Sequence, residues 1–159
     1  MEYMRMKQKN LFLMCGAPGS GKSTWLCKHA DGPIVSRDAI RFSMVGEDEH
    51  YFSKETEVFN TYIKTIQMFL DDNSTEKIYC DATQLNENAR NKVLDRLILP
   101  EGTQLYAVVL RPSIETTLER NAQRTGRAEV PVSAVRRMYN SYSDPAYDKK
   151  YKITPIYAE

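Results

Sequence analysis

The chain has 159 residues, 42% of them hydrophobic, which is enough for one hydrophobic core and too few for two ordinary domains. Its 22 lysines and arginines nearly balance 21 aspartates and glutamates, so it lacks the general basicity of proteins that bind along a duplex. The sequence has no apolar stretch long enough for a membrane span, and its three cysteines form no CxxC pair. We therefore expect a single cytoplasmic domain over residues 1–159 with no membrane contact.

Short apolar segments alternate along the chain with segments of helical periodicity. The expected strands are residues 11–15, 33–36, 77–80, 105–110 and 151–157, the last confined to a sheet edge by Pro155. The expected helices are residues 22–29, 38–45, 54–70, 86–99, 113–121 and 132–142. This alternation predicts an α/β fold with a four- to five-stranded, mainly parallel sheet and helices on both faces.

The segment between the first strand and the first helix matches the phosphate-binding pattern G-x-x-x-x-G-K-[ST]. Its glycines let backbone N–H groups converge on phosphate oxygens, and the helix N-terminus adds a partial positive charge. Lys22 is expected to reach the β- and γ-phosphates of ATP, and the Ser23 hydroxyl is expected to ligate Mg²⁺. The expected ATP-binding residues are Gly16, Ala17, Pro18, Gly19, Ser20, Gly21, Lys22, Ser23 and Thr24. The fold is thus predicted to be a P-loop three-layer sandwich, although switches, motors and kinases all share this loop.

Two aspartates directly follow expected strands, where ligands bind in parallel α/β sheets. Asp38 is placed to accept a proton from an attacking hydroxyl, although an aspartate at such a junction also commonly caps the next helix. Arg41, three residues later, shares its helical face. Asp81 ends the third strand, where many P-loop proteins hold a carboxylate near Mg²⁺, or it forms an Asx turn before Thr83.

Three arginines surround the end of the helix expected at residues 113–121 and the loop that follows it, namely Arg120, Arg124 and Arg127. Arg120 and Arg124 are four residues apart and are expected on one helical face. The alternative is a solvated basic helix end that complements the helix dipole. Because a phosphate loop is present, we favour a lid whose arginines close over the γ-phosphate.

Together these segments resemble the kinase domain of phage-type polynucleotide 5′-hydroxyl kinases. The resemblance extends over nearly the whole chain in the order and spacing of its motifs. They are the phosphate loop continued to Trp25, R-D-x-x-R at 37–41, C-D-A-T at 80–83, Arg120 with Arg124, and V-P at 130–131 leading into 137–139. The phosphate loop alone is common, and the other elements make the resemblance more specific.

The resemblance implies ATP-dependent transfer of the γ-phosphate to the 5′-hydroxyl end of single-stranded DNA or RNA, with Mg²⁺ as cofactor. It implies that Asp38 is the general base, that Lys22 contacts the ATP phosphates, and that Arg120 and Arg124 clamp them. These four residues are the expected catalytic residues.

The resemblance also implies an acceptor site and a metal site. Arg41 is expected to contact the phosphate next to the acceptor hydroxyl, Asp81 to help organise the site, and Ser23 to hold the metal. The loop after Arg124 is slightly longer than in the phage pattern. Because the resemblance ends before the phosphatase portion of the phage enzyme, we expect no 3′-phosphatase activity, no protein partner and a monomer.

Two other functions remain open on the same motifs. A small-molecule kinase acting on a sugar, nucleoside or sugar nucleotide could use Asp38 equally well. A nucleotide-binding switch would bind ATP without transferring phosphate. Tyr51, Phe52 and Tyr139 could stack on a terminal base, but aromatic residues at such spacings more often belong to the core, so they are not among the expected site residues.

Overall fold

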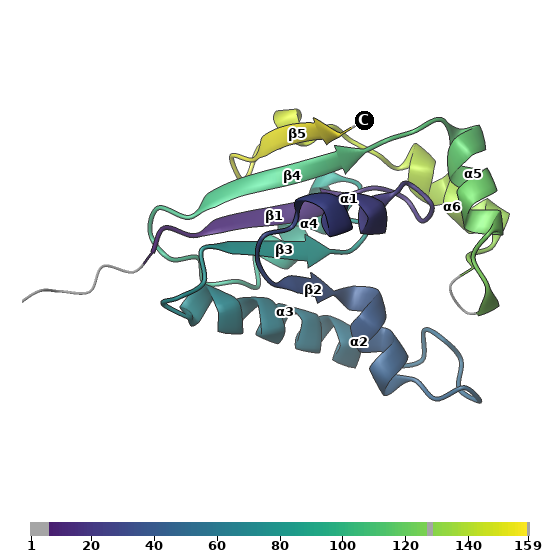
Figure 1. Ribbon diagram of the computed structural model, residues 1–159, viewed down its shortest axis with the longest axis horizontal. Coiled ribbons are helices and arrows are strands. Elements are labelled where there is room, and N and C mark those ends of the chain that lie inside the picture. Colours follow the sequence, from purple (N-terminus) through teal and green to yellow (C-terminus); the bar gives the residue numbers. More distant parts are fainter. Residues whose placement is uncertain (1–6, 127–128, 159) are drawn as a thin grey trace, which may run out of the picture.

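The sheet of this protein has five strands that all run in the same direction. The computed structural model describes residues 7–126 and 129–158. The strands are β1 (Asn10–Cys15), β2 (Ile34–Ser36), β3 (Lys77–Asp81), β4 (Gln104–Leu110) and β5 (Thr154–Ala158). Their order is β2-β3-β1-β4-β5, and every neighbouring pair is parallel, as the arrows in Figure 1 show. The predicted α/β fold is confirmed, and β5 lies at an edge as Pro155 required.

Helices cover both faces of this sheet because successive strand residues point to opposite sides. Leu11 and Leu13 of β1 face a core formed with α3 (Glu55–Asp71) and α4 (Glu87–Leu94). Met14 faces the other side, where it packs with Leu26 of α1 (Lys22–His29). In Figure 1, α1 lies in front of the sheet and α4 behind it. The molecule therefore has the three predicted layers.

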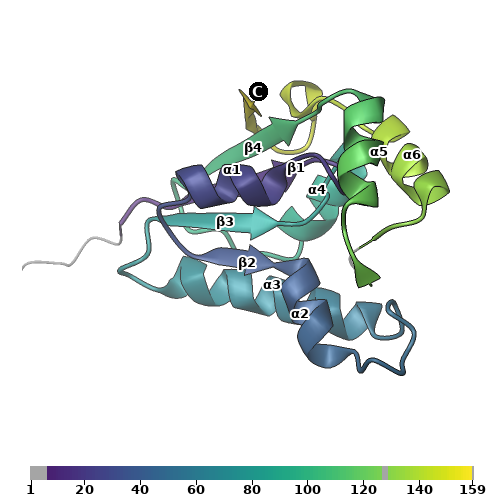
Figure 2. The ribbon, with the colours of Figure 1, turned by 45° about the vertical axis from the view of Figure 1, so that its right-hand side comes forward.

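Three further helices lie at the carboxyl ends of the strands. They are α2 (Arg37–Met44), α5 (Ile114–Ala122) and α6 (Val132–Asn140). In Figures 1 and 2, α2 lies at one side of this end and the pair α5 and α6 at the other, with the loop between β1 and α1 between them. This end of the sheet is where a parallel α/β fold binds its ligands.

The helix predicted at residues 86–99 is shorter than expected. It ends at Leu94, and the backbone then tightens through bonds from Arg96 N to Val93 O and from Leu97 N to Leu94 O. The Gln67 side chain of α3 accepts a bond from Ile98 N at 2.9 Å and donates one to Ile98 O at 3.0 Å. The Ile98 N–H and C=O thus bond to a side chain of another helix and not within a continued α4. The prediction was therefore wrong for the last turns of this helix. The other elements differ from prediction by only a few residues at their ends.

No helix within residues 7–126 and 129–158 is both long enough and apolar enough to cross a bilayer. The longest, α3, has 17 residues and carries charged side chains along one face.

Candidate active site

The loop between β1 and α1 has the backbone geometry of a phosphate cradle. Gly19 and Gly21 adopt φ angles of +87° and +99°, which favour glycine. A Cβ on Gly19 would lie 2.4 Å from Thr117 O of α5, and one on Gly16 would lie 2.3 Å from Ser20 Oγ. The loop therefore accepts no larger residue at these positions. Within the described residues, the buried Ser20 hydroxyl has no hydrogen-bond partner, which fits a loop built to surround an anion.

Lys22 begins α1 and curls back over the loop. Its Nζ donates hydrogen bonds to Gly16 O at 2.8 Å and Ala17 O at 3.1 Å. Burial lowers its pKa from 10.5 to about 8, partly offset by the charges of Asp81 and Asp38. The Lys22 amine thus lies near two carboxylates and is less solvated than a surface lysine. An anionic ligand would stabilise its charged form.

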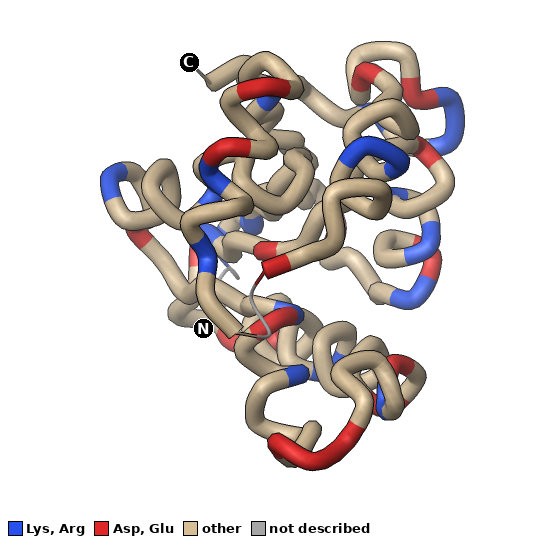
Figure 3. Tube along the Cα trace, turned by 90° about the vertical axis from the view of Figure 1, so that its right-hand side faces the viewer, with Lys and Arg blue, Asp and Glu red and all other residues tan. Residues whose placement is uncertain are grey.

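A cavity of about 600 Å³ opens at the carboxyl ends of the strands and brings the predicted site residues together. Gly16 and Ala17, the first two predicted residues of the loop, are buried and are not among the residues that line the cavity. The predicted residues that line it are Pro18, Gly19, Ser20, Gly21, Lys22, Ser23, Thr24, Asp38, Arg41, Asp81, Arg120 and Arg124. Figure 3 looks onto this end of the molecule.

Asp38 is not the cap of α2, which resolves the alternative left open by the sequence. The cap is Ser36, whose Oγ accepts a hydrogen bond from Ala39 N at 3.1 Å. The Asp38 carboxylate, with 58% of its side chain exposed, instead accepts hydrogen bonds from Arg41 and from the Tyr51 hydroxyl. It therefore stands in the cavity as an accessible proton acceptor.

Arg41, which was expected to contact the acceptor phosphate, is deeply buried. Its side chain is only 7% exposed, and Glu55 of α3 accepts bonds from its Nε at 2.5 Å and its Nη2 at 2.9 Å. Arg37 donates from Nη2 to the same carboxylate at 3.2 Å and keeps more of its guanidinium open to the cavity. Sequence reasoning missed both Arg37 and Glu55 as site residues. Arg37 could have been found in R-D-x-x-R, whereas Glu55 lies on the next helix and carried no signal.

Asp81 ends β3, and Lys22 and Asp38 lie close enough for their charges to act on its carboxyl. Burial raises its pKa, while Lys22 lowers it and Asp38 raises it. The next residues, Ala82 and Thr83, also line the cavity. Thr83 O accepts a hydrogen bond from Gly16 N at 3.1 Å, so the end of β3 is tied to the phosphate loop.

The predicted lid arginines both reach the cavity, but not from one helix. Arg120 lies in the last turn of α5, and its Nη1 donates to Ser20 O of the phosphate loop at 3.3 Å. Arg124 lies beyond the end of α5 at Ala122, so the reasoning that placed both on one helical face was wrong. The third arginine of the predicted lid, Arg127, lies outside the described residues.

Two of the three aromatic residues set aside in the sequence lie in the site. Tyr51 and Phe52 line the cavity together with Phe42 of α2. Tyr139 does not line it; its hydroxyl donates to Pro112 O, and its ring lies under the Arg111 guanidinium. Phe42 and Phe52 remain 41% and 53% exposed, so they are not core residues.

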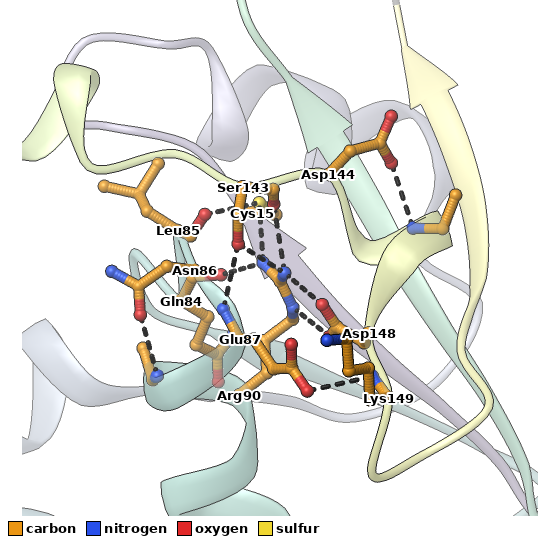
Figure 4. A network of polar contacts seen from close by, with 12 residues as sticks. Cys15, Gln84, Leu85, Asn86, Glu87, Arg90, Ser143, Asp144, Asp148 and Lys149 are labelled. Carbon is orange, nitrogen blue, oxygen red and sulfur yellow. Dashed lines mark hydrogen bonds and ion pairs between the residues drawn. The ribbon is translucent and has the colours of Figure 1, made fainter.

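A buried polar network around Arg90, shown in Figure 4, reaches Cys15, the residue before the phosphate loop. Arg90 of α4 forms two 2.7 Å bonds to Asp148, and both side chains are almost completely buried. Arg90 also donates to Gln84 O at 3.1 Å and Ser143 O at 3.0 Å, and its Nη1 lies 3.7 Å from Cys15 Sγ. The network joins the C-terminal segment to the residue that precedes the loop. Its only sequence signal is that Arg90 falls on the apolar face of its helix.

The cavity fits a nucleoside triphosphate and a divalent cation. The glycine loop and Lys22 would hold the phosphates. Ser23, with its exposed hydroxyl at the start of α1, and Asp81 are the oxygen donors that would hold Mg²⁺ directly or through its waters.

A glycine loop of this geometry before a helix, at the carboxyl edge of a parallel sheet, defines a P-loop nucleotide-binding fold. The sequence matches the AAA domain family over residues 11–145, and the chain belongs to that family. The resemblance predicted from the sequence is thereby confirmed at the level of family and fold.

Solved structures with this fold include nucleic-acid and sugar kinases. One is a chain of the Pnkp1/Rnl/Hen1 RNA repair complex, with 22% identity and a TM-score of 0.67 over 86% of this chain and 45% of that one. A fungal RNA kinase has 12% identity and a TM-score of 0.62 over 96% and 75% of the two chains. A gluconokinase from Sinorhizobium meliloti 1021 has 19% identity and a TM-score of 0.55 over 96% and 83%. The present chain thus spans less than half of the repair-complex chain that it matches.

Proposed function

We propose that this protein is an ATP- and Mg²⁺-dependent kinase that phosphorylates the 5′-hydroxyl end of single-stranded DNA or RNA. The observation that supports it best is the position of Asp38. This exposed carboxylate shares one cavity with the phosphate loop and the two lid arginines, and Arg37 and Arg41 lie beside it. A proton acceptor opposite a triphosphate site serves a hydroxyl acceptor, and neighbouring guanidinium groups suit an acceptor that carries a phosphate.

The proposed reaction is one in-line displacement without a covalent enzyme intermediate. Asp38 orients the acceptor hydroxyl and takes its proton while the oxygen attacks the γ-phosphorus, and the bond to the β–γ bridging oxygen breaks to release ADP. Lys22, Arg120 and Arg124 offset the charge of the phosphates as the phosphoryl group moves. Bound Mg²⁺ would supply further charge neutralisation on the phosphate oxygens.

The test is transfer of labelled γ-phosphate from ATP to 5′-hydroxyl DNA and RNA oligonucleotides. Asp38→Asn should lower kcat about a hundredfold or more while ATP binding persists, because the exposed Asp38 contributes little to the core. Asp48→Asn is the matched control, since this exposed aspartate lies in the neighbouring turn outside the cavity, and it should behave as wild type. Near-normal transfer by Asp38→Asn would remove its assigned role.

A small-molecule kinase is the second candidate, and the likeness to the gluconokinase over most of both chains favours it. The near-neutral charge is also compatible with a small acceptor. Gluconate, a free nucleoside and a nucleoside 3′-phosphate should be assayed beside the oligonucleotides. If a nucleoside is used as well as its 3′-phosphate, or gluconate is preferred, the second candidate holds. Binding of ATP without transfer to any acceptor would indicate a switch.

A further inference from the structure

Three neighbouring aromatic rings line the cavity, inclined to one another by 55° and 71°. They are Phe42, Tyr51 and Phe52, here called the aromatic platform. The ring centroids of Phe42 and Tyr51 are 5.4 Å apart, and those of Tyr51 and Phe52 are 4.9 Å apart. The Arg41 guanidinium carbon lies 5.0 Å from the Tyr51 centroid and 5.3 Å from the Phe52 centroid. Because Glu55 fixes Arg41, the rings rest on a support that is itself held in place.

The aromatic platform lies beside the proposed general base and away from the residues that would hold ATP. The Tyr51 hydroxyl donates to Asp38 Oδ1 at 3.3 Å. The platform comes from α2 and the segment after it, whereas the lid arginines belong to α5 and the segment after it. Figure 2 shows α2 and α5 on different sides of this end of the molecule. A ligand resting on the platform would therefore bring its reactive group to Asp38, and would be the acceptor.

The chemistry of the aromatic platform selects a flat and neutral part of that acceptor. The Arg41 and Glu55 side chains beside the rings already bond to each other, so the platform itself presents mainly ring surface to a ligand. The adjoining turn carries three exposed acidic residues, seen as the red turn at the foot of Figure 3 and spanning residues 47–49. Their charge disfavours placing the phosphate of the acceptor over the rings, which leaves an uncharged part of the acceptor to face them. Exposed ring faces instead suit base stacking.

We propose that the aromatic platform binds the base of the acceptor's terminal nucleoside by stacking, with Phe52 as the main contact. This inference rests on the proposed function, because a nucleoside carries its base and its 5′-hydroxyl on one sugar. Stacking on the three rings would let the protein select its class of acceptor. It would favour a nucleic-acid end, which carries a base, over a sugar, which does not. Base identity should matter little, since every base presents a π-face.

The experiment compares a 5′-hydroxyl oligonucleotide with one that lacks only its terminal base. Wild type should use and bind the base-containing acceptor about tenfold better, within the range known for stacking on an aromatic residue. Phe52→Ala should reduce this ratio toward one by weakening the base-containing acceptor alone, and Phe52→Trp should restore it. Tyr147→Ala, which removes an exposed ring outside the cavity, should leave the ratio unchanged.

Binding is measured separately from transfer, with 2-aminopurine as the terminal base, whose fluorescence is quenched when it stacks. Base-dependent binding with quenching lost in Phe52→Ala supports the aromatic platform even if no phosphate is transferred, in which case only the proposed reaction fails. Transfer that ignores the terminal base, or equal loss of both acceptors in Phe52→Ala, overturns the platform and leaves the kinase reaction standing. Absence of oligonucleotide binding overturns both.

Discussion

The Arg41 guanidinium is held by the Glu55 carboxylate through two hydrogen bonds, of 2.5 and 2.9 Å, that join α2 to α3. Burial would raise the pKa of Glu55, but the hydrogen bond and charge of Arg41, with the charge of Arg37, lower it overall, so the carboxylate stays ionised. One carboxylate thus orders both arginines beside Asp38.

We expect Glu55→Gln to loosen this arrangement. The unfolding free energy should fall by about 1–3 kcal/mol, because bonds from a buried guanidinium lose their charged acceptor. The acceptor KM should rise severalfold, since Arg41 would no longer be fixed. Glu57→Gln is the control on the same helix, because its side chain is exposed. Thermal melts and steady-state kinetics check both variants, and an unchanged KM with lower stability would restrict Glu55 to a structural role.

Gly19→Ala should abolish ATP binding. The new Cβ would meet Thr117 O at 2.4 Å, in a backbone conformation at φ +87° that alanine disfavours. The matched control is Gly102→Ala, where φ is +82° but nothing lies within 4 Å, so it should cost about 1 kcal/mol of stability and leave ATP affinity unchanged. Calorimetric titration with ATP distinguishes the two, and retained affinity in Gly19→Ala would contradict the described loop.

ATP binding should take up a proton between about pH 8 and 10.5. The pKa of Lys22 is lowered to about 8 in the free protein, and triphosphate favours its charged form and raises that pKa again. Affinity should therefore weaken as pH rises above about 8, by at most tenfold per pH unit. Calorimetry at pH 9 in buffers of different ionisation enthalpy measures the uptake.

Two variants separate Lys22 from the other lysines in this test. Lys22→Arg should bind ATP without proton uptake, because arginine stays charged over this range. Lys28→Gln, in the last turn of the same helix, should keep the wild-type uptake. Equal uptake in all three proteins would assign the proton to another group.

The buried pair of Arg90 and Asp148 should be the most sensitive polar contact outside the cavity. Asp148→Asn leaves the Arg90 charge without its counter-charge, which should cost about 3–5 kcal/mol and lower Tm by roughly 10 °C. Asp95→Asn, which removes an exposed partner of Lys150, should change Tm by less than about 2 °C. A small shift in Asp148→Asn would show that the pair is dispensable.

The sequence by itself determined the alternation of strands and helices, the phosphate loop and the edge position of β5. These features depend on neighbours in the chain: side-chain periodicity, glycines at fixed spacing, and a proline that cannot donate a ladder bond. It also identified Asp38 and Asp81 as candidates, because the carboxyl ends of parallel strands share one edge of the sheet.

Only the tertiary structure decided which partners these residues meet. Glu55 bonds to Arg41 from another helix. Gln67 of α3 bonds to the backbone of Ile98, beyond the end of α4. The exposed rings of Phe42 and Phe52 line the cavity. None of these contacts follows from local spacing, because each joins residues whose proximity arises from helix and strand packing. Periodicity can place a side chain on a face of its own element, but the element opposite that face is fixed by the fold.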